Sequence, residues 1–222
     1  MSSIQFLRIK HNVETIIIYS ESSPEKLLLD NGFNVSDCII EYIEPRGIYN
    51  AFNHGVNRAT GKWIMFFGGD DFLLPSISDL LIELDIKKYD CSAIVCNVVF
   101  GNKKIFKPFT SKFGLIFRNW CQQGVLYNKS IFSNLSFDEK YPIQADHKFN
   151  IEVSAYPNNN IIYFDKVIAF FNTNGISQSV VDKKFRSDFP TIIKTNFGVL
   201  FGLITYFKRE LSNILKNKNL NE

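Results

Sequence analysis

Residues 47–71 read GIYNAFNHGVNRATGKWIMFFGGDD, and this stretch decides the fold. Its first half repeats apolar or small residues at the spacing of one helical face: Ile48, Ala51, Phe52, Gly55, Val56 and Ala59. Gly61 suits the end of that helix, because glycine adopts the left-handed conformation after a helix without steric cost. The apolar run Trp63–Phe67 is too short for an amphipathic helix and predicts a strand buried on both faces.

Two adjacent carboxylates, Asp70 and Asp71, follow this strand. In open α/β sheets, ligands bind at the carboxyl ends of the strands. A divalent cation takes oxygen ligands from one or two carboxylates and from substrate phosphates, and it neutralises the charge of a departing diphosphate. A helix start is the alternative, since Asp favours N-caps and Ile77–Leu84 has a helical pattern. The pair alone fits both readings equally, but the preceding helix and strand favour a ligand site.

The whole stretch from Gly47 to Asp71 resembles the signature of the family 2 glycosyltransferases, enzymes of the GT-A fold that use nucleotide-diphospho-sugars. The resemblance implies an α/β protein with a Rossmann-like mixed sheet flanked by helices. It also implies that Asp71 holds Mn²⁺ or Mg²⁺ on the donor diphosphate, with Asp70 beside it on the ribose or the metal. Arg46, just before Gly47, would lie near the nucleotide.

A second stretch resembles the acceptor-side half of the same family. It begins with Gln123–Phe132 and continues through Phe137–Glu139 to Ala145–Phe149. In that family a carboxylate that opens a helix acts as the catalytic base, and the matching residue here is Asp146. Inverting sugar transfer needs a base near the acceptor hydroxyl, across the anomeric carbon from the leaving diphosphate. A capping Asp, stabilised by the helix dipole, is the alternative reading.

For three polar residues near these motifs, the preferred interpretation is a structural role rather than contact with substrate. Tyr49 and Asn53 are expected to position their helix rather than to touch substrate. His147 adjoins the expected base and would either line the acceptor site or, as the preferred reading, lie on the surface at a helix start.

The C-terminal part of the chain differs in character, which predicts a GT-A-like domain over residues 1–187 and an amphipathic helical tail over residues 188–222. The apolar run Phe197–Phe207 is too short to span the ~30 Å hydrocarbon core of a bilayer. Lys208 and Arg209 follow it, which suits a helix lying in a membrane interface with basic groups against anionic headgroups. A helix packed on the domain or in a dimer fits the pattern equally well.

Composition narrows the protein class further. The 222 residues carry a formal net charge of only +3, and no run of basic and aromatic residues forms a nucleic-acid footprint. Four cysteines without metal-ligand spacing predict reduced thiols. Residues 1–10 lack the apolar core of a signal peptide. These features predict a cytoplasmic protein, either free or peripheral on the inner face of the cell membrane.

The sequence therefore predicts an inverting, metal-dependent glycosyltransferase of the hexosyltransferase type. It would move a sugar from a nucleotide-diphospho-sugar to a hydroxyl of a saccharide or lipid-linked acceptor, in bacterial surface polysaccharide synthesis. A catalytically degenerate GT-A binding or scaffold subunit is the alternative. It is motivated by the altered loop Ser20–Pro24 and by the apparent lack of the usual first strand before Val13–Tyr19. A metal-dependent phosphohydrolase would use the same strand-end carboxylates but leaves residues 123–149 unexplained.

Overall fold

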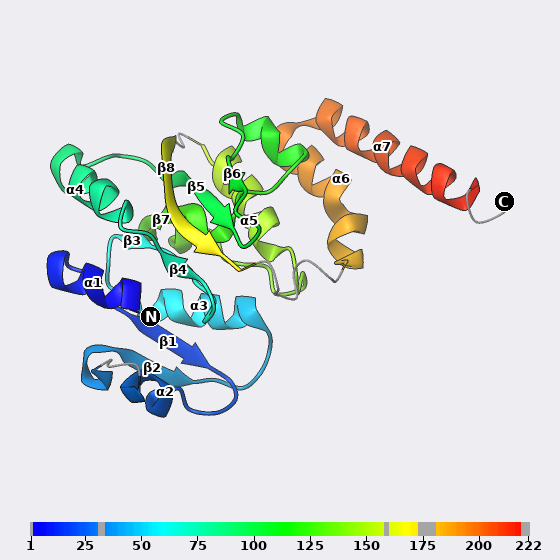
Figure 1. Cartoon of the computed structure of the whole chain (residues 1–222). Helices are drawn as coiled ribbons and strands as arrows, with labels where there is room; N and C mark the ends of the chain where they lie inside the picture. The colour runs from blue at the N-terminus through cyan, green and yellow to red at the C-terminus, as the bar shows by residue number, and fades with distance from the viewer. Residues whose placement is uncertain (1, 31–33, 158–159, 173–180, 219–222) are drawn as a thin grey trace.

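A computed structural model describes residues 2–30, 34–157, 160–172 and 181–218 as helices around two separate sheets (Figure 1). The smaller sheet pairs two parallel strands near the N-terminus, β1 (Ile16–Tyr19) and β2 (Ile39–Tyr42). The helical elements of this part of the chain are α1 (Ser2–Lys10), α2 (Glu25–Asp30) and the 3₁₀ turn η1 (Val35–Asp37). Helix α3 (Ile48–Arg58) follows and packs against β1.

The larger sheet is mixed and has the order β3-β7-β5-β8-β4, with β6 paired to β5. The central pair, β5 and β8, runs parallel, and every other pair is antiparallel. Its strands are β3 (Trp63–Ile64), β4 (Phe72–Leu73), β5 (Ala93–Phe100), β6 (Ile105–Phe106), β7 (Val125–Asn128) and β8 (Ile161–Phe171).

Strand β5 separates two hydrophobic cores because its side chains alternate between the faces of the sheet. Ala93 and Val95 join the core on the side of α3 and α5 (Ala145–Ala155), whereas Ile94 and Cys96 join the core on the side of α4 (Ile77–Lys87). All four side chains are almost fully buried. Burial on both faces explains the unbroken apolar sequence of this strand.

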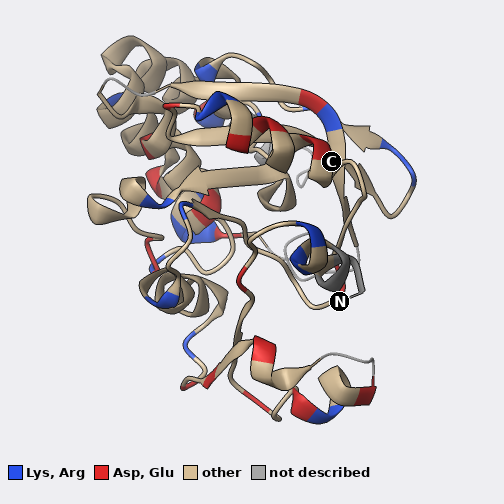
Figure 2. Ribbon diagram, turned by 90° about the vertical axis from the view of Figure 1, so that its left-hand side faces the viewer, with Lys and Arg blue, Asp and Glu red and all other residues tan. Residues whose placement is uncertain are grey.

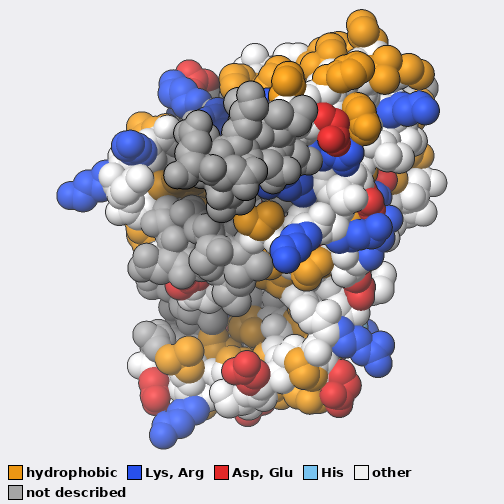
Figure 3. All heavy atoms as spheres, turned by 90° about the vertical axis from the view of Figure 1, so that its right-hand side faces the viewer, with side chains coloured by type: hydrophobic (Ala, Val, Ile, Leu, Met, Phe, Trp, Pro, Cys, Tyr) orange, Lys and Arg blue, Asp and Glu red, His pale blue; other side chains and the backbone are white. Residues whose placement is uncertain are grey.

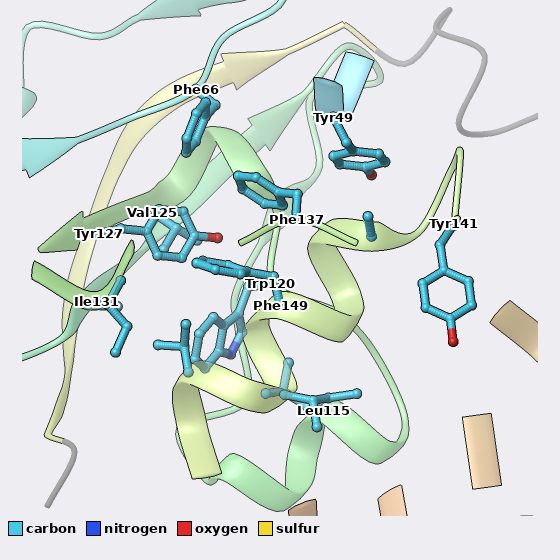
Figure 4. Packing of buried hydrophobic residues seen from close by; sticks show 14 of the residues in the cluster. Tyr49, Phe66, Leu115, Trp120, Val125, Tyr127, Ile131, Phe137, Tyr141 and Phe149 are labelled. Atoms are coloured by element: carbon cyan, nitrogen blue, oxygen red, sulfur yellow. The ribbon is translucent and has the colours of Figure 1, made fainter. Parts of the chain in front are cut away.

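Aromatic rings fill much of the first core (Figure 4). Phe137 lies at its centre, with its ring 4.5 Å from that of Phe149, 5.2 Å from that of Phe66 and 5.6 Å from that of Tyr49. These rings come from the segment before α5, from α5 itself, from the segment after β3 and from α3. The core thereby fixes the start of α3 against the start of α5.

Two segments differ from their predicted form. The expected strand Trp63–Phe67 is paired only at Trp63–Ile64, where it runs antiparallel to β7, although Phe66 is buried as predicted. Residues 110–120 have no helical or strand periodicity in the sequence, yet they contain the 3₁₀ helix η2 (Lys112–Ile116). The other short 3₁₀ turns are η3 (Gln122–Gly124) and η4 (Lys129–Ser133).

The C-terminal helices are α6 (Lys183–Phe197) and α7 (Val199–Lys218), which pack against each other. Helix α6 crosses the predicted boundary at residue 188 without a break, and Phe185, Ile192 and Ile193 are buried in the first core. The division of the chain at residue 188 stays a prediction. No helix in the described part of the chain is both long and apolar enough to cross a membrane.

Candidate active site

The two predicted strand-end carboxylates differ sharply in their surroundings. Asp71 is only 7% exposed, whereas its neighbour Asp70 is exposed. Both approach Gly68, where a Cβ atom would lie 3.1 Å from Asp70 Oδ1 and 3.1 Å from Asp71 Oδ2. Glycine at position 68 therefore leaves room for two carboxylates side by side.

The oxygens of Asp71 already accept hydrogen bonds from the protein. Asp71 Oδ2 accepts from Gln123 Nε2 at 2.7 Å and from the Gly68 backbone N–H at 3.2 Å. Asp71 Oδ1 accepts from the Asn172 backbone N–H at 2.9 Å. Asp71 thus ties the loop after β3 to the end of β8 and to the segment before β7.

Asp70 is the carboxylate of the pair that faces solvent. The described residues include no group of three His, Cys, Asp or Glu side chains that could hold a metal ion. Mg²⁺ or Mn²⁺ can be held by one or two carboxylates, with substrate phosphates and water as the remaining ligands. The pair therefore fits the predicted cation, and the exposed oxygens of Asp70 are better placed to reach it than those of Asp71.

Asp146, the predicted base, lies in the first turn of α5, at the side of the sheet where α3 begins. Its Oδ2 accepts from Asn119 Nδ2 at 2.8 Å, and its Oδ1 lies 2.8 Å from the Tyr49 hydroxyl. The N-cap of α5 is Gln144, which makes no side-chain capping bond. Asp146 therefore does not occupy the cap position that the alternative reading assigned to it.

The Tyr49 hydroxyl has two acceptors within reach and one proton to donate. It lies 2.7 Å from the Ile143 carbonyl oxygen and 2.8 Å from Asp146 Oδ1. If the hydroxyl proton points to Ile143, the contact with Asp146 is a hydrogen bond only when Asp146 carries a proton and donates it. The geometry can therefore accommodate both protonation states of Asp146.

Burial raises the pKa of Asp146 to about 6, while hydrogen bonds from Tyr49 and Asn119 and the helix N-terminus act in the opposite direction. A carboxylate with this pKa is mostly ionised at neutral pH yet basic enough to take a proton. This is the range to which enzymes tune carboxylates that act as general bases.

A chain of side-chain hydrogen bonds fixes the orientation of Asn119, which contacts the candidate base. Asn119 Oδ1 accepts from Asn150 Nδ2 at 2.9 Å, and Asn150 Oδ1 accepts from the buried hydroxyl of Tyr127 at 2.7 Å. Each amide uses both its donor and its acceptor in this chain. Asn119 is thereby held with its Nδ2 directed at Asp146.

One short segment connects the two ends of the site. Asn119 contacts Asp146, and Gln123, four residues later, contacts Asp71. Cys121 lies between them, and the pKa of its thiol is raised to about 12 by burial, with further contributions from the charges of Asp146 and Asp71. Asp71 and the candidate base are therefore held by the two ends of one five-residue segment.

The remaining predicted residues have varied positions. Arg46 is exposed just before α3, three residues from Tyr49. Asn53 makes two hydrogen bonds with the backbone of Phe137, of 2.9 Å and 3.0 Å, consistent with a positioning role. The surface reading of His147 is wrong, because its side chain is buried and its Nε2 lies 2.7 Å from the Leu115 carbonyl oxygen.

The sequence reasoning missed Asn119 and Gln123 as parts of the site. Asn119 lies in a segment without helical or strand periodicity, so no pattern indicated which way its side chain points. Gln123 opens the second family-like stretch, and its contact with Asp71 depends on the pairing of β7 in the larger sheet.

Comparison with known proteins identifies the family and agrees with the fold. The family model described as glycosyl transferase family 2 matches residues 10–147, more than half of the chain. A PGL/p-HBAD biosynthesis glycosyltransferase of Mycobacterium tuberculosis is 27% identical over 210 residues, which cover 91% of this chain and 82% of that protein. A protein of the same name from Mycobacterium bovis matches equally.

Two solved structures share the fold at low sequence identity. Staphylococcus aureus TarS 1–349 in complex with UDP-GlcNAc has a TM-score of 0.62 at 14% identity, over 81% of this chain and 56% of that one. The mannosyltransferase PcManGT of Pyrobaculum calidifontis, in complex with GDP-Man and Mn²⁺, has a TM-score of 0.50 at 12% identity, over 90% and 55%. The chain spans about half the length of these structures.

The predicted GT-A fold is confirmed by these neighbours and by the mixed sheet with its flanking helices. Together with the family match over residues 10–147, they establish that the chain belongs to glycosyl transferase family 2.

Proposed function

We propose that this glycosyltransferase moves a sugar, with inversion, from a nucleotide-diphospho-sugar to an acceptor hydroxyl. The observation that carries the proposal is the segment 119–123, which contacts the base-like carboxylate of Asp146 at one end and the strand-end carboxylate of Asp71 at the other. UDP, UDP-GlcNAc and GDP-Man are bound by the structural neighbours, which supports a nucleotide donor of this kind.

In this proposal Asp146 is the general base. Its ionised carboxylate accepts the proton of the acceptor hydroxyl while the acceptor oxygen forms a bond to the anomeric carbon and the bond to the donor diphosphate breaks. Tyr49 and Asn119 hold the carboxylate in place from two sides. Because Asp146 and the strand-end carboxylates hold opposite ends of the site, attack from the side opposite the leaving group, and hence inversion, is the natural outcome.

Asp70 and Asp71 form the donor end. The exposed carboxylate of Asp70 would bind Mn²⁺ or Mg²⁺, which supplies positive charge against the departing diphosphate. Asp71 would hold the loop that presents Asp70, because its own oxygens are engaged by Gln123 and by backbone N–H groups. Arg46 would lie at the nucleotide. The Mn²⁺ in the mannosyltransferase neighbour supports a metal-dependent donor site.

The acceptor in this proposal is a saccharide or a lipid-linked saccharide used in surface polysaccharide synthesis, at the inner face of the cell membrane. The curated relatives carry the name of a biosynthetic glycosyltransferase, which supports an anabolic role over a degradative one. The phosphohydrolase reading has no such support.

The test is release of nucleoside diphosphate from a panel of UDP-, GDP- and dTDP-sugars, with and without Mn²⁺. We expect one donor to yield its nucleoside diphosphate only with metal, and the acceptor product to show the mass of one added sugar. Tight donor binding without any release, for every donor and acceptor tried, would instead identify a catalytically degenerate binding subunit.

A further inference from the structure

Helix α7 turns an apolar face outward. Large hydrophobic side chains on successive turns are between 45% and 68% exposed, namely Val199, Leu200, Leu203, Ile204, Tyr206, Phe207 and Leu211. At 100° per residue they cover nearly half of the helix circumference. Exposure of this extent over three turns is unusual for a helix whose apolar side would ordinarily face the core.

The opposite side of α7 packs against α6 and attaches the helix to the rest of the protein. Gly202 is so close to α6 that an added Cβ would lie 2.5 Å from the Cβ of Lys194. Thr205 is also buried on this side, and Arg209 Nη1 donates to the Ser187 carbonyl oxygen of α6 at 2.9 Å. Packing on α6 therefore leaves the apolar side of α7 uncovered.

Helix η2 extends this exposed surface. The ring of Phe113 stacks on that of Phe201 with 4.5 Å between centroids, and Lys208 Nζ lies 5.3 Å from the centre of the Phe117 ring. Phe117 is itself 68% exposed. The exposed residues of α7 together with Phe113 and Phe117 form one surface, the α7–η2 face. Figure 3 shows hydrophobic side chains gathered along the top of the molecule, where α7 lies.

The segments that build this face, residues 103–118 and 189–211, contain eight basic residues and one acidic residue, Glu210. Residues 103–118 include five Lys or Arg and no Asp or Glu, and residues 189–209 include three and none. Glu210, the next acid along α7, pairs with Arg209 at 3.0 Å. The side of the molecule seen in Figure 2 instead carries charges of both signs intermingled.

We propose that the α7–η2 face docks on an anionic lipid bilayer. Its apolar side chains would enter the headgroup region, and Lys112, Arg118 and Lys208 would contact lipid phosphates. A border with this excess of basic residues complements an anionic bilayer, whereas it would repel the same border on a second copy of the chain.

The position of the face suits the acceptor end of the site. Phe117 lies two residues before Asn119, which contacts Asp146, and α5 packs on η2 through the hydrogen bond from His147 to Leu115. A bilayer on this face would bring lipid-borne acceptors toward Asp146. This last step rests on the proposed function, whereas bilayer binding itself does not.

The test is flotation of the full-length protein with vesicles of phosphatidylcholine alone or with 30% phosphatidylglycerol. We expect binding only to the anionic vesicles, and weakening by added salt. The double variant Leu203→Ser/Phe207→Ser should bind about 100-fold more weakly, because each side chain contributes roughly tenfold through its buried apolar area. Lys208→Glu should weaken binding about tenfold or more.

Matched controls lie on other surfaces. Ile86→Ser, at a 73% exposed position of α4, and Lys26→Glu, at an exposed position of α2, should bind like the parent protein. Asp146→Asn should also bind like the parent, so near-normal transfer by this variant with intact flotation would count against the proposed function alone. Parent protein that does not float with anionic vesicles, or a lipid-free dimer that the Leu203→Ser/Phe207→Ser change dissociates, would overturn the docking proposal.

Discussion

The Tyr49 hydroxyl lies 2.8 Å from Asp146 Oδ1, although 97 positions separate the two residues in the sequence. Tyr49 reaches Asp146 from the first turn of α3, and Asp146 lies in the first turn of α5. The aromatic core around Phe137 holds the two helix starts together. The glycine-led stretch that decides the fold is thereby linked directly to the candidate base.

Tyr49→Phe should move the acid limb of the pH–rate profile to higher pH. The tyrosine hydrogen bond lowers the pKa of Asp146, which burial raises to about 6, so its loss lets the pKa rise further. Phenylalanine keeps the ring packing against Phe137. The check is kcat/KM against pH from 5 to 9. An unchanged acid limb would show that Asp146 ionisation does not limit transfer.

The variants Asp70→Asn and Asp71→Asn should lose different properties, cation binding in the first and folding stability in the second. Asp70→Asn should keep the melting temperature of the parent and lose thermal stabilisation by Mn²⁺ plus nucleoside diphosphate, because Asp70 is exposed and an amide is a poor cation ligand. Asp71→Asn should lower stability by about 1–3 kcal/mol, since one amide oxygen cannot replace two oxygens that accept three N–H groups. The reverse pattern would assign the cation to Asp71, as the family resemblance implies.

Gly124→Ala should destabilise the protein by about 1–3 kcal/mol, the usual range for overpacking. A Cβ at this position would lie 2.7 Å from Val98 Cγ2 and 2.8 Å from the Cys96 carbonyl oxygen on β5. Gly69→Ala is the matched control, because a Cβ there meets no atom within 4 Å. Urea unfolding of both variants tests this close approach of η3 to the central strand.

Asp146→Asn should change how stability responds to acid. The buried His147 has its pKa lowered from 6.5 to about 4, so folding loses stability as pH falls from 6.5 to 4. Asp146, with its pKa raised from 3.8 to about 6, gains stability as pH falls from 6 to 3.8 and offsets that loss. Without Asp146, stability should fall by up to about 1.4 kcal/mol per pH unit between pH 6 and pH 4 relative to the parent. Parallel curves would contradict these ionisation states.

Local sequence patterns predicted the elements well where one periodicity dominates. The helical pattern at Ile77–Leu84 lies within α4 and begins at the same residue, because its apolar residues are spaced for one buried helical face. Strand β5 has the unbroken apolar sequence of a strand buried on both sides of a sheet. The run Trp63–Phe67 was harder to predict, since its pairing with β7 ends at Ile64 for reasons that lie in the tertiary structure.

The site was predictable only in part for the same reason. Asp70, Asp71 and Asp146 stand next to recognisable strand and helix patterns, so their positions in the fold could be expected. Their different environments could not, because they depend on Gln123 and Asn119, which reach the carboxylates from a segment without periodicity. The buried state of His147 likewise depends on η2, which has no sequence signature.

The most direct test of the account compares Asp146→Asn with Asp146→Ala in transfer and in stability at pH 8. Asparagine can reproduce the protonated carboxyl, accepting from Asn119 with its oxygen and donating to the Tyr49 oxygen while that hydroxyl donates to Ile143. We therefore expect Asp146→Asn to be at least as stable as the parent and to lose transfer by roughly 10²-fold or more, with donor binding retained. Asp146→Ala should lose both transfer and stability. Near-normal transfer by a well-folded Asp146→Asn protein would contradict the role of Asp146 as the base.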